Sequence, residues 1–212
     1  MIRFFTQFAA ALLLPLATGL MLADSADTAR SVSAQFSHGN TNGHFEFYPE
    51  ELDGPLTGGF GELTCHSCHF DYEINDERGS LTVEGPTENY RPAKAHRFQV
   101  AVESERLGIG GFQMTARFED GSQAGTFEFE GDRLMFTSAT DPDIQYLQHS
   151  SDGTSPTGER KVVWEFVWNA PEKNDRPVIF NIAANAGNYD YSEFGDWIYV
   201  KEFHSKPVSA EP

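Results

Sequence analysis

Positive charge is scarce in this sequence. Its 212 residues include 15 lysines and arginines against 32 aspartates and glutamates, which gives a formal net charge of −17 with neutral histidines. A surface of that sign repels nucleic acid and anionic lipid headgroups, and it attracts a basic partner. Nucleic-acid binding is therefore excluded. Docking to a basic partner and a role of the charge in solubility alone both stay open.

Three other signals are missing. No segment has a long helical period, and no hydrolase triad, phosphate-binding loop or paired-carboxylate motif stands out. A second pair of ligands, which a structural zinc site usually needs, does not accompany the two cysteines. We therefore expect neither a zinc module nor an enzyme.

The first 26 residues are typical of a secretory signal. Arg3 lies in a short positive region, an apolar run extends from Phe4 to Leu22, and small and polar residues follow up to Ala26. A run of this length also fits an uncleaved membrane anchor. In both cases we expect the folded part to be periplasmic or at the cell surface, with membrane contact only through this segment.

The remaining chain is long enough for one domain. Residues 27–54 form an acidic stretch without a sustained period, which we expect to be an irregular lead-in. We place the folded domain at residues 55–205 and a short tail at 206–212. Within the domain, the glycine-rich residues 54–62 lead into the only cysteine motif, and glycine allows backbone to approach a ligand closely.

From residue 81 onward, apolar residues alternate with polar or small ones. This period-two pattern predicts strands around the following groups: Leu81 and Val83; Phe98, Val100 and Val102; Phe112, Met114, Ala116 and Phe118; Phe127 and Phe129; Leu134 and Phe136; Val162, Trp164, Phe166 and Trp168; Val178, Phe180 and Ile182; Trp197, Tyr199 and Lys201. Short strands separated by turn signals predict an all-β protein with an antiparallel β-sandwich.

Both cysteines lie in Cys65-His66-Ser67-Cys68-His69, which has the C-x-x-C-H pattern of covalent c-type haem attachment. Two thiols three positions apart can add to the two vinyl groups of one porphyrin, and the following histidine can bind its iron. The motif predicts one haem c on a loop at residues 57–72, held by Cys65 and Cys68, with His69 as the proximal iron ligand.

Two other interpretations of the motif stay open. An exported C-x-x-C can close a small disulfide loop. It can also act as a thiol oxidoreductase, although that activity is expected at a helix start within a βαβ unit, which this sequence does not show.

Several segments resemble bacterial reelin-domain-like proteins of the choice-of-anchor V type, over about residues 55 to 204. They include Thr57-Gly58-Gly59-Phe60-Gly61-Glu62, Tyr90-Arg91-Pro92, Gly111-Phe112-Gln113-Met114-Thr115-Ala116 and Trp164-Glu165-Phe166-Val167-Trp168-Asn169-Ala170-Pro171. The resemblance implies an extracytoplasmic Greek-key β-sandwich of the reelin or immunoglobulin-like kind, whose N-terminal loop carries the C-x-x-C-H motif. It says more about fold than about activity.

The second axial iron ligand has several candidates. His149 matches a histidine position of the resembling family, and we favour it as the distal ligand, with a structural hydrogen bond as its competing role. Met114 is a weaker alternative, because a methionine at core spacing usually fills space. The other candidates are His38, His44, His96 and His204, and the position could also be open.

A second loop, near the end of the chain, contains two tyrosines that are candidate ligand contacts. Tyr189 and Tyr191 stand where the resembling family has a run of Asn, Gly and Asp. They could stack against a ligand, although a plain loop tip is the simpler interpretation.

Together these observations favour an extracytoplasmic, single-haem, cytochrome-like protein that transfers electrons to a redox partner with a basic surface. The alternative is a surface-binding β-sandwich module in which the haem or a Cys65–Cys68 disulfide is structural. A haem enzyme or gas sensor ranks below both, because it needs an open sixth site with acid or base groups.

Overall fold

The structure is a computed structural model that describes residues 54–137, 141, 143–172 and 176–208. The predicted secretory signal, most of the acidic lead-in and the candidate ligands His38 and His44 lie outside the described residues. Within those ranges, no helix is long and apolar enough to cross a membrane.

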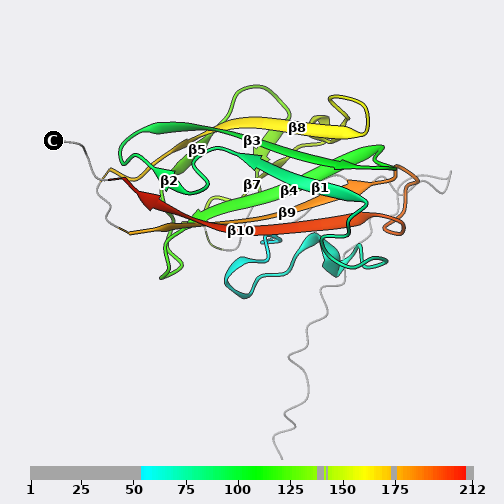
Figure 1. The fold of residues 1–212 in the computed structure, drawn as a ribbon, viewed down its shortest axis with the longest axis horizontal. Coiled ribbons are helices and arrows are strands. Elements are labelled where there is room, and N and C mark those ends of the chain that lie inside the picture. The colour runs from blue at the N-terminus through cyan, green and yellow to red at the C-terminus, as the bar shows by residue number, and fades with distance from the viewer. Residues whose placement is uncertain (1–53, 138–140, 142, 173–175, 209–212) are drawn as a thin grey trace, which may run out of the picture. The chain divides into compact units, whose positions relative to one another are not determined.

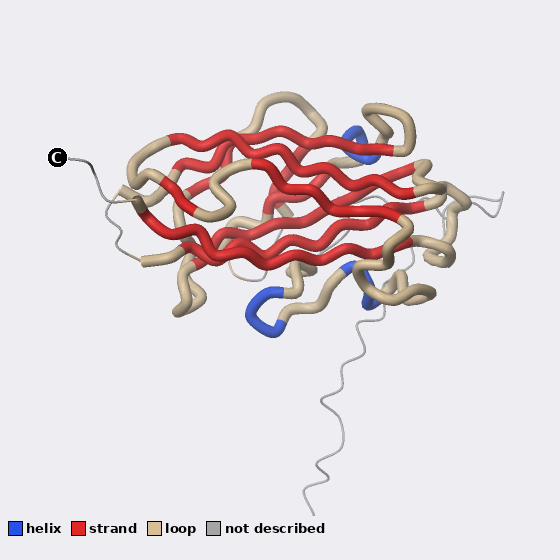
Figure 2. Tube along the Cα trace, in the orientation of Figure 1, coloured by secondary structure: helices blue, strands red, loops and turns tan. Residues whose placement is uncertain are grey.

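Two β-sheets make up the domain (Figures 1 and 2). The four-stranded sheet has the order β1 (Gly79–Glu84), β3 (Ala95–Ser104), β8 (Lys161–Asn169), β5 (Thr126–Glu128). The six-stranded sheet has the order β2 (Asn89–Tyr90), β10 (Trp197–Pro207), β9 (Val178–Gly187), β4 (Ile109–Arg117), β7 (Leu147–His149), β6 (Leu134–Phe136). The named strands pair antiparallel except for β2 with β10. The predicted all-β sandwich is confirmed.

Aromatic side chains fill the space between the sheets. Trp164 and Trp168 of β8 face Phe112 of β4 and Phe180 of β9, with ring centroids 4.6 Å apart for Phe112 and Trp164 and 4.9 Å for Trp168 and Phe180. Each of these side chains is at most 2% exposed. Because each large aromatic ring removes much apolar area from water, the alternating residues of these strands supply the core.

The structure contains two strands that the sequence did not predict. Residues 147–149, expected in a loop, form β7, where Gln148 pairs with Gln113 of β4 and accepts a hydrogen bond from its side chain at 3.1 Å. The other is the two-residue β2, which adds to the C-terminal end of β10. Neither carries the apolar alternation by which a strand is predicted.

The outer face of the six-stranded sheet is also covered. Every residue of β4 from Gly110 to Arg117 is buried, although one half of them faces away from the core. Residues 54–75, which we call the cysteine loop, lie over this face (Figure 1). The Leu56 amide donates to Oε1 of Gln113 at 2.5 Å, and a Cβ on Gly59 would collide with Asn181 of β9. The loop is therefore packed onto the sheet.

Candidate functional site

The cysteine motif forms a tight turn. A 3₁₀ helix, η3, spans Cys65–Ser67, and the amides of Cys68 and His69 both donate to the Cys65 carbonyl oxygen, at 3.2 and 3.1 Å. The Thr64 hydroxyl caps this helix by accepting from the His66 amide at 3.2 Å. Both cysteines are free thiols in the structure. Residues three apart eclipse in ideal 3₁₀ geometry, and Cys65 and Cys68 are three apart. This arrangement suits a short disulfide.

The two thiols differ in their surroundings. Cys65 is half-buried, and desolvation raises the pKa of its thiol to about 12, whereas Cys68 is exposed. Redox catalysis needs a thiolate with a lowered pKa. Burial thus works against Cys65 itself as the activated thiolate.

His69 fixes the motif to the end of the sheet. Its Nδ1 lies 2.8 Å from Oδ2 of Asp196, a carboxylate that is 4% exposed and precedes β10. Oδ1 of Asp196 accepts from the Asn188 amide at 2.9 Å, and Nδ2 of Asn185 lies 3.3 Å from Nδ1 of His69. The histidine that follows the cysteines is thus engaged by the loop that connects β9 to β10.

A buried network fixes the other end of the cysteine loop. Nη2 of Arg117 lies 2.7 Å from Oε1 of Glu62, and their side chains are 6% and 9% exposed. The Tyr146 hydroxyl donates to the same Oε1 at 2.6 Å, and the Thr57 hydroxyl donates to Oε2 at 2.5 Å. Burial and the neighbouring Glu62 both raise the pKa of Tyr146. These contacts tie the loop to β4 at a fixed position.

The cysteine loop and the loop that connects β9 to β10 carry aromatic side chains that are exposed to solvent. Phe70, Tyr189, Tyr191 and Phe194, which we call the aromatic rim, are 57%, 57%, 54% and 46% exposed. The rings of Phe70 and Phe194 lie 5.9 Å apart edge to face, and those of Tyr189 and Tyr191 lie 5.2 Å apart. The four rings thus form two pairs on two loops, and exposed aromatic rings grouped in this way are a candidate interaction surface.

The backbone of the β9–β10 loop holds the tyrosines in place. Tyr189 and Tyr191 both have φ of 64°, a left-handed conformation that a tyrosine adopts only when its surroundings enforce it. The enforcing contacts come from polar turns: the Asp190 amide donates to Oδ1 of Asn188 at 2.9 Å, and the Ser192 amide donates to Oδ1 of Asp190 at 3.0 Å. The tyrosines therefore sit on a braced loop.

The predicted distal ligands Met114 and His149, and the further candidate His204, contact other groups of the domain. Met114 is fully buried in the core. Nδ1 of His149 lies 3.0 Å from both the backbone nitrogen and the backbone oxygen of Phe112, and a Cβ on Gly111 would approach the His149 ring to 2.7 Å. His149 thus braces the β4 edge, which was its competing role. Nε2 of His204 lies 3.0 Å from Oε1 of Glu202 on the exposed part of β10.

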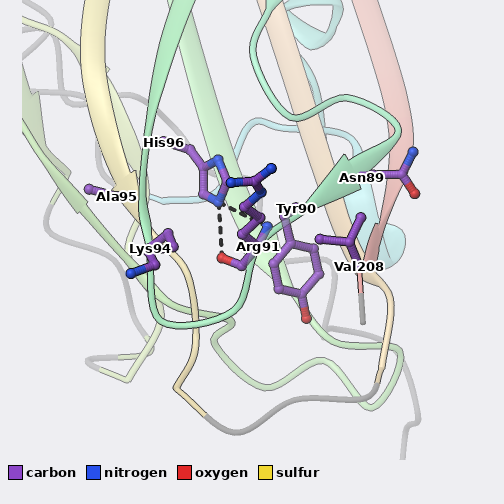
Figure 3. A pocket seen from close by; sticks show the side chains of 7 residues that line it. All are labelled: Asn89, Tyr90, Arg91, Lys94, Ala95, His96 and Val208. Carbon is purple, nitrogen blue, oxygen red and sulfur yellow. Dashed lines mark hydrogen bonds between the residues drawn. The ribbon is translucent and has the colours of Figure 1, made fainter. Parts of the chain in front are cut away.

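His96 lines a pocket at the opposite end of β10 (Figure 3). Its Nε2 lies 3.1 Å from both the backbone nitrogen and the backbone oxygen of Arg91, and Tyr90 and Lys94 form other parts of the wall. The pocket is therefore separate from the cysteine motif.

The sequence did not predict two parts of this site. Phe70 and Phe194 are not predicted as site residues from the sequence. The signal that could have identified them is a cluster of aromatic residues in a segment rich in Asn, Asp, Gly and Ser. Arg117 and Glu62 were missed because nothing in the sequence pairs two charges 55 positions apart.

Comparison with known proteins gives fold-level similarity only. No protein-family model matches the sequence, and no curated protein matches it. The chain is similar to the human F-spondin reeler domain, with 20% identity, a TM-score of 0.41, and coverage of 63% of this chain and 93% of that one. A second structure, the Reelin-N domain of F-spondin, gives 20% identity, a TM-score of 0.43, and coverage of 67% and 95%. A chain of a cohesin–dockerin complex from Clostridium thermocellum gives 5% identity, a TM-score of 0.36, and coverage of 61% and 99%.

TM-scores of this size carry no argument, so the β-sandwich assignment rests on the two sheets described above. The narrower resemblance to choice-of-anchor V proteins gains no support, because no family model matches.

The cytochrome interpretation is wrong, and the predictions of haem, iron and electron transfer that belong to it are wrong as well. In the part of the chain that the structure describes, no group of three or more His, Cys, Asp or Glu side chains is placed to hold a metal ion. Nδ1 of His149 contacts the backbone of β4, and Met114 is a core residue. The covalent state of the two thiols is a separate question, which an intact mass answers.

Proposed function

We propose that this protein is an extracytoplasmic binding module that presents the aromatic rim to a partner, with Cys65 and Cys68 joined in a structural disulfide. The observation that carries the proposal is the rim itself: four exposed aromatic side chains come from two loops that are far apart in the sequence. Rings that pack in a core lower the free energy of the fold, whereas these rings lie in water, where they are available to a partner.

A hydrogen bond between the two loops that carry the rim supports the same proposal. The Gly195 amide donates to Oδ2 of Asp71 at 2.8 Å, which joins the β9–β10 loop to the cysteine loop next to Phe70 and Phe194. A surface that is already ordered loses little conformational entropy when it binds. Binding needs no catalytic group, and the proposal includes none.

Binding assays on the intact exported protein test the proposal. The probes are an arginine-rich peptide, an acidic peptide, a neutral oligosaccharide and phosphatidylcholine vesicles. We expect saturable binding to at least one probe, weakened at least about tenfold by combining Tyr189→Ser with Phe194→Ser. The control is Phe136→Ser, since Phe136 is 38% exposed on β6 and outside the rim. Absence of saturable binding to every probe, or equal binding by the double variant, overturns the proposal.

A further inference from the structure

Arginines of this chain repeatedly stack on an aromatic ring while they pair with a carboxylate. The guanidinium carbon of Arg117 lies 4.1 Å from the Phe60 ring centroid, and Nη2 lies 2.7 Å from Glu62. For Arg176 the ring is Phe118, at 4.2 Å, and the carboxylate is Asp120, at 2.8 Å.

A third arginine does the same beside the cysteine loop. The Arg78 guanidinium carbon lies 4.4 Å from the Tyr72 ring centroid, and Nε lies 2.7 Å from Oδ1 of Asp76. In two of the three cases the carboxylate follows the ring by two positions, as in Phe60-Gly61-Glu62 and Phe118-Glu119-Asp120. The combination suits arginine, because a planar guanidinium can stack and donate hydrogen bonds at once.

The aromatic rim offers the same pair of groups to solvent. Tyr191-Ser192-Glu193 has the ring and the carboxylate at the same spacing, and Asp71 directly follows Phe70. Four carboxylate residues close to the rim residues in the sequence are exposed: Asp71, Glu73, Asp190 and Glu193.

Cations from the chain itself only partly offset this charge. Arg106 lies near enough to contribute to the lowered pKa of Asp190, and its guanidinium carbon lies 5.8 Å from the Trp197 ring centroid. Arg78 is held by Asp76. The whole molecule carries a formal net charge of −17, so its field attracts a cationic partner to this surface.

We infer that the aromatic rim binds an arginine-rich segment of a partner protein, whose guanidinium groups stack on the rim aromatics and pair with the carboxylates beside them. The inference rests on the proposed binding function and names the chemical class of the partner. The same charge pattern disfavours acidic peptides and anionic membranes.

Fluorescence anisotropy with two labelled peptides tests the inference. One peptide alternates glycine and arginine, and the other has the same length with lysine in place of arginine. We expect the intact protein to bind the arginine peptide several-fold more tightly, because lysine lacks the planar, forked donor. Combining Tyr189→Ser with Phe194→Ser should weaken arginine-peptide binding about fivefold to thirtyfold, the loss expected for two exposed cation–π contacts.

A second variant isolates the carboxylates. Glu193→Gln should weaken arginine-peptide binding and reduce its dependence on salt, whereas Glu128→Gln on β5, also exposed and distant from the rim, should do neither. Unfolding midpoints equal to that of the unmodified protein show that each variant is folded.

The contrary outcomes separate this inference from the proposed function. Equal binding of both peptides, unaffected by the rim variants, indicates attraction by net charge alone and overturns the inference. Rim-dependent binding of the neutral oligosaccharide without arginine-peptide binding overturns the inference and leaves the binding function standing. Absence of binding to every probe overturns both.

Discussion

Two ion pairs of this molecule lie at very different depths. The Arg117–Glu62 pair is almost completely buried, whereas Lys161 and Glu103 are 41% and 52% exposed, with Nζ and Oε2 3.7 Å apart. A buried charge that loses its partner keeps its desolvation penalty, while an exposed charge is rehydrated. The individual contribution of a charged residue therefore depends on where the fold places it.

Replacing Glu62 with alanine tests this difference. Glu62→Ala leaves the Arg117 guanidinium buried without its carboxylate, and we expect the free energy of unfolding to fall by about 3–5 kcal/mol in urea titrations. Glu103→Ala, at the exposed pair, should change it by at most about 1 kcal/mol. Equal losses in the two variants would show that the network does not hold the cysteine loop to β4.

The cysteine pair gives a second prediction for single residues. Purified from an oxidising compartment, the protein should have an intact mass two hydrogens below that of the reduced chain, since exported cysteines three positions apart can close a short disulfide loop. Cys68→Ser should lower the free energy of unfolding by about 2 kcal/mol, the entropy of closing so short a loop. Ser67→Ala is the control. An intact mass equal to that of the reduced chain would overturn the disulfide.

At the scale of elements, β7 contacts β4 through a side chain as well as through backbone pairing. Its last residue, His149, contacts the Phe112 backbone through its imidazole nitrogen. This contact takes the place of a ladder hydrogen bond at the point where the chain leaves β7 for the 3₁₀ helix η4 (Asp152–Thr154). A side chain therefore extends the pairing of β4 beyond the end of its neighbour.

Substituting His149 should loosen this edge selectively. His149→Ala leaves the Phe112 amide without the imidazole acceptor, so we expect a loss of about 1–3 kcal/mol in the free energy of unfolding and faster hydrogen exchange at Phe112. His204→Ala removes an exposed histidine, and it should cost less than about 1 kcal/mol. Unchanged exchange at Phe112 in His149→Ala would contradict the bracing role.

The elements that the sequence predicted share one property. β8 buries one apolar face, so alternation identifies it, and Trp164 lies where the pattern requires. β9 is buried on both faces, but its large apolar residues, such as Phe180, still alternate. The packing of the cysteine loop could not be predicted in this way. It depends on polar contacts such as Leu56 to Gln113, and on the close approach of Gly59 to Asn181, which a residue pattern does not encode.

The candidate site also has a part that the sequence predicts and a part that it does not predict. The cysteine motif was evident from spacing alone, but the pattern C-x-x-C-H is compatible with more than one chemistry. The contacts that the spacing does not encode are three-dimensional: His69 meets Asp196 across more than a hundred residues, and Met114 faces the core.

For the whole molecule, the buried tyrosines make stability depend on alkaline pH. Burial raises the pKa of Tyr199 to about 12, and burial with Glu62 raises that of Tyr146. The folded protein therefore retains protons that the unfolded chain releases near a pH of about 10. Because the unfolded state then binds fewer protons, stability is complete below that pH and declines as pH rises through about 12.

Urea midpoints measured from neutral to strongly alkaline pH test this dependence. We expect the midpoint to fall with rising pH above about 10. Tyr199→Phe keeps the ring and removes the ionisable hydroxyl, so the decline should become shallower. Tyr189→Phe, at an exposed ring, is the control. An alkaline decline of the same slope in Tyr199→Phe would assign the effect to other groups.

The attachment of the cysteine loop to β10 has a consequence for the order of events during maturation. The Asn75 amide donates to the Ile198 carbonyl oxygen at 2.9 Å, so a segment from the start of the domain is completed by its last strand. In a chain exported from its N-terminus, both thiols emerge well before β9, which lies against η3, and before β10. Contacts this distant in sequence also form slowly. We therefore expect the proposed disulfide to form before the sandwich is complete.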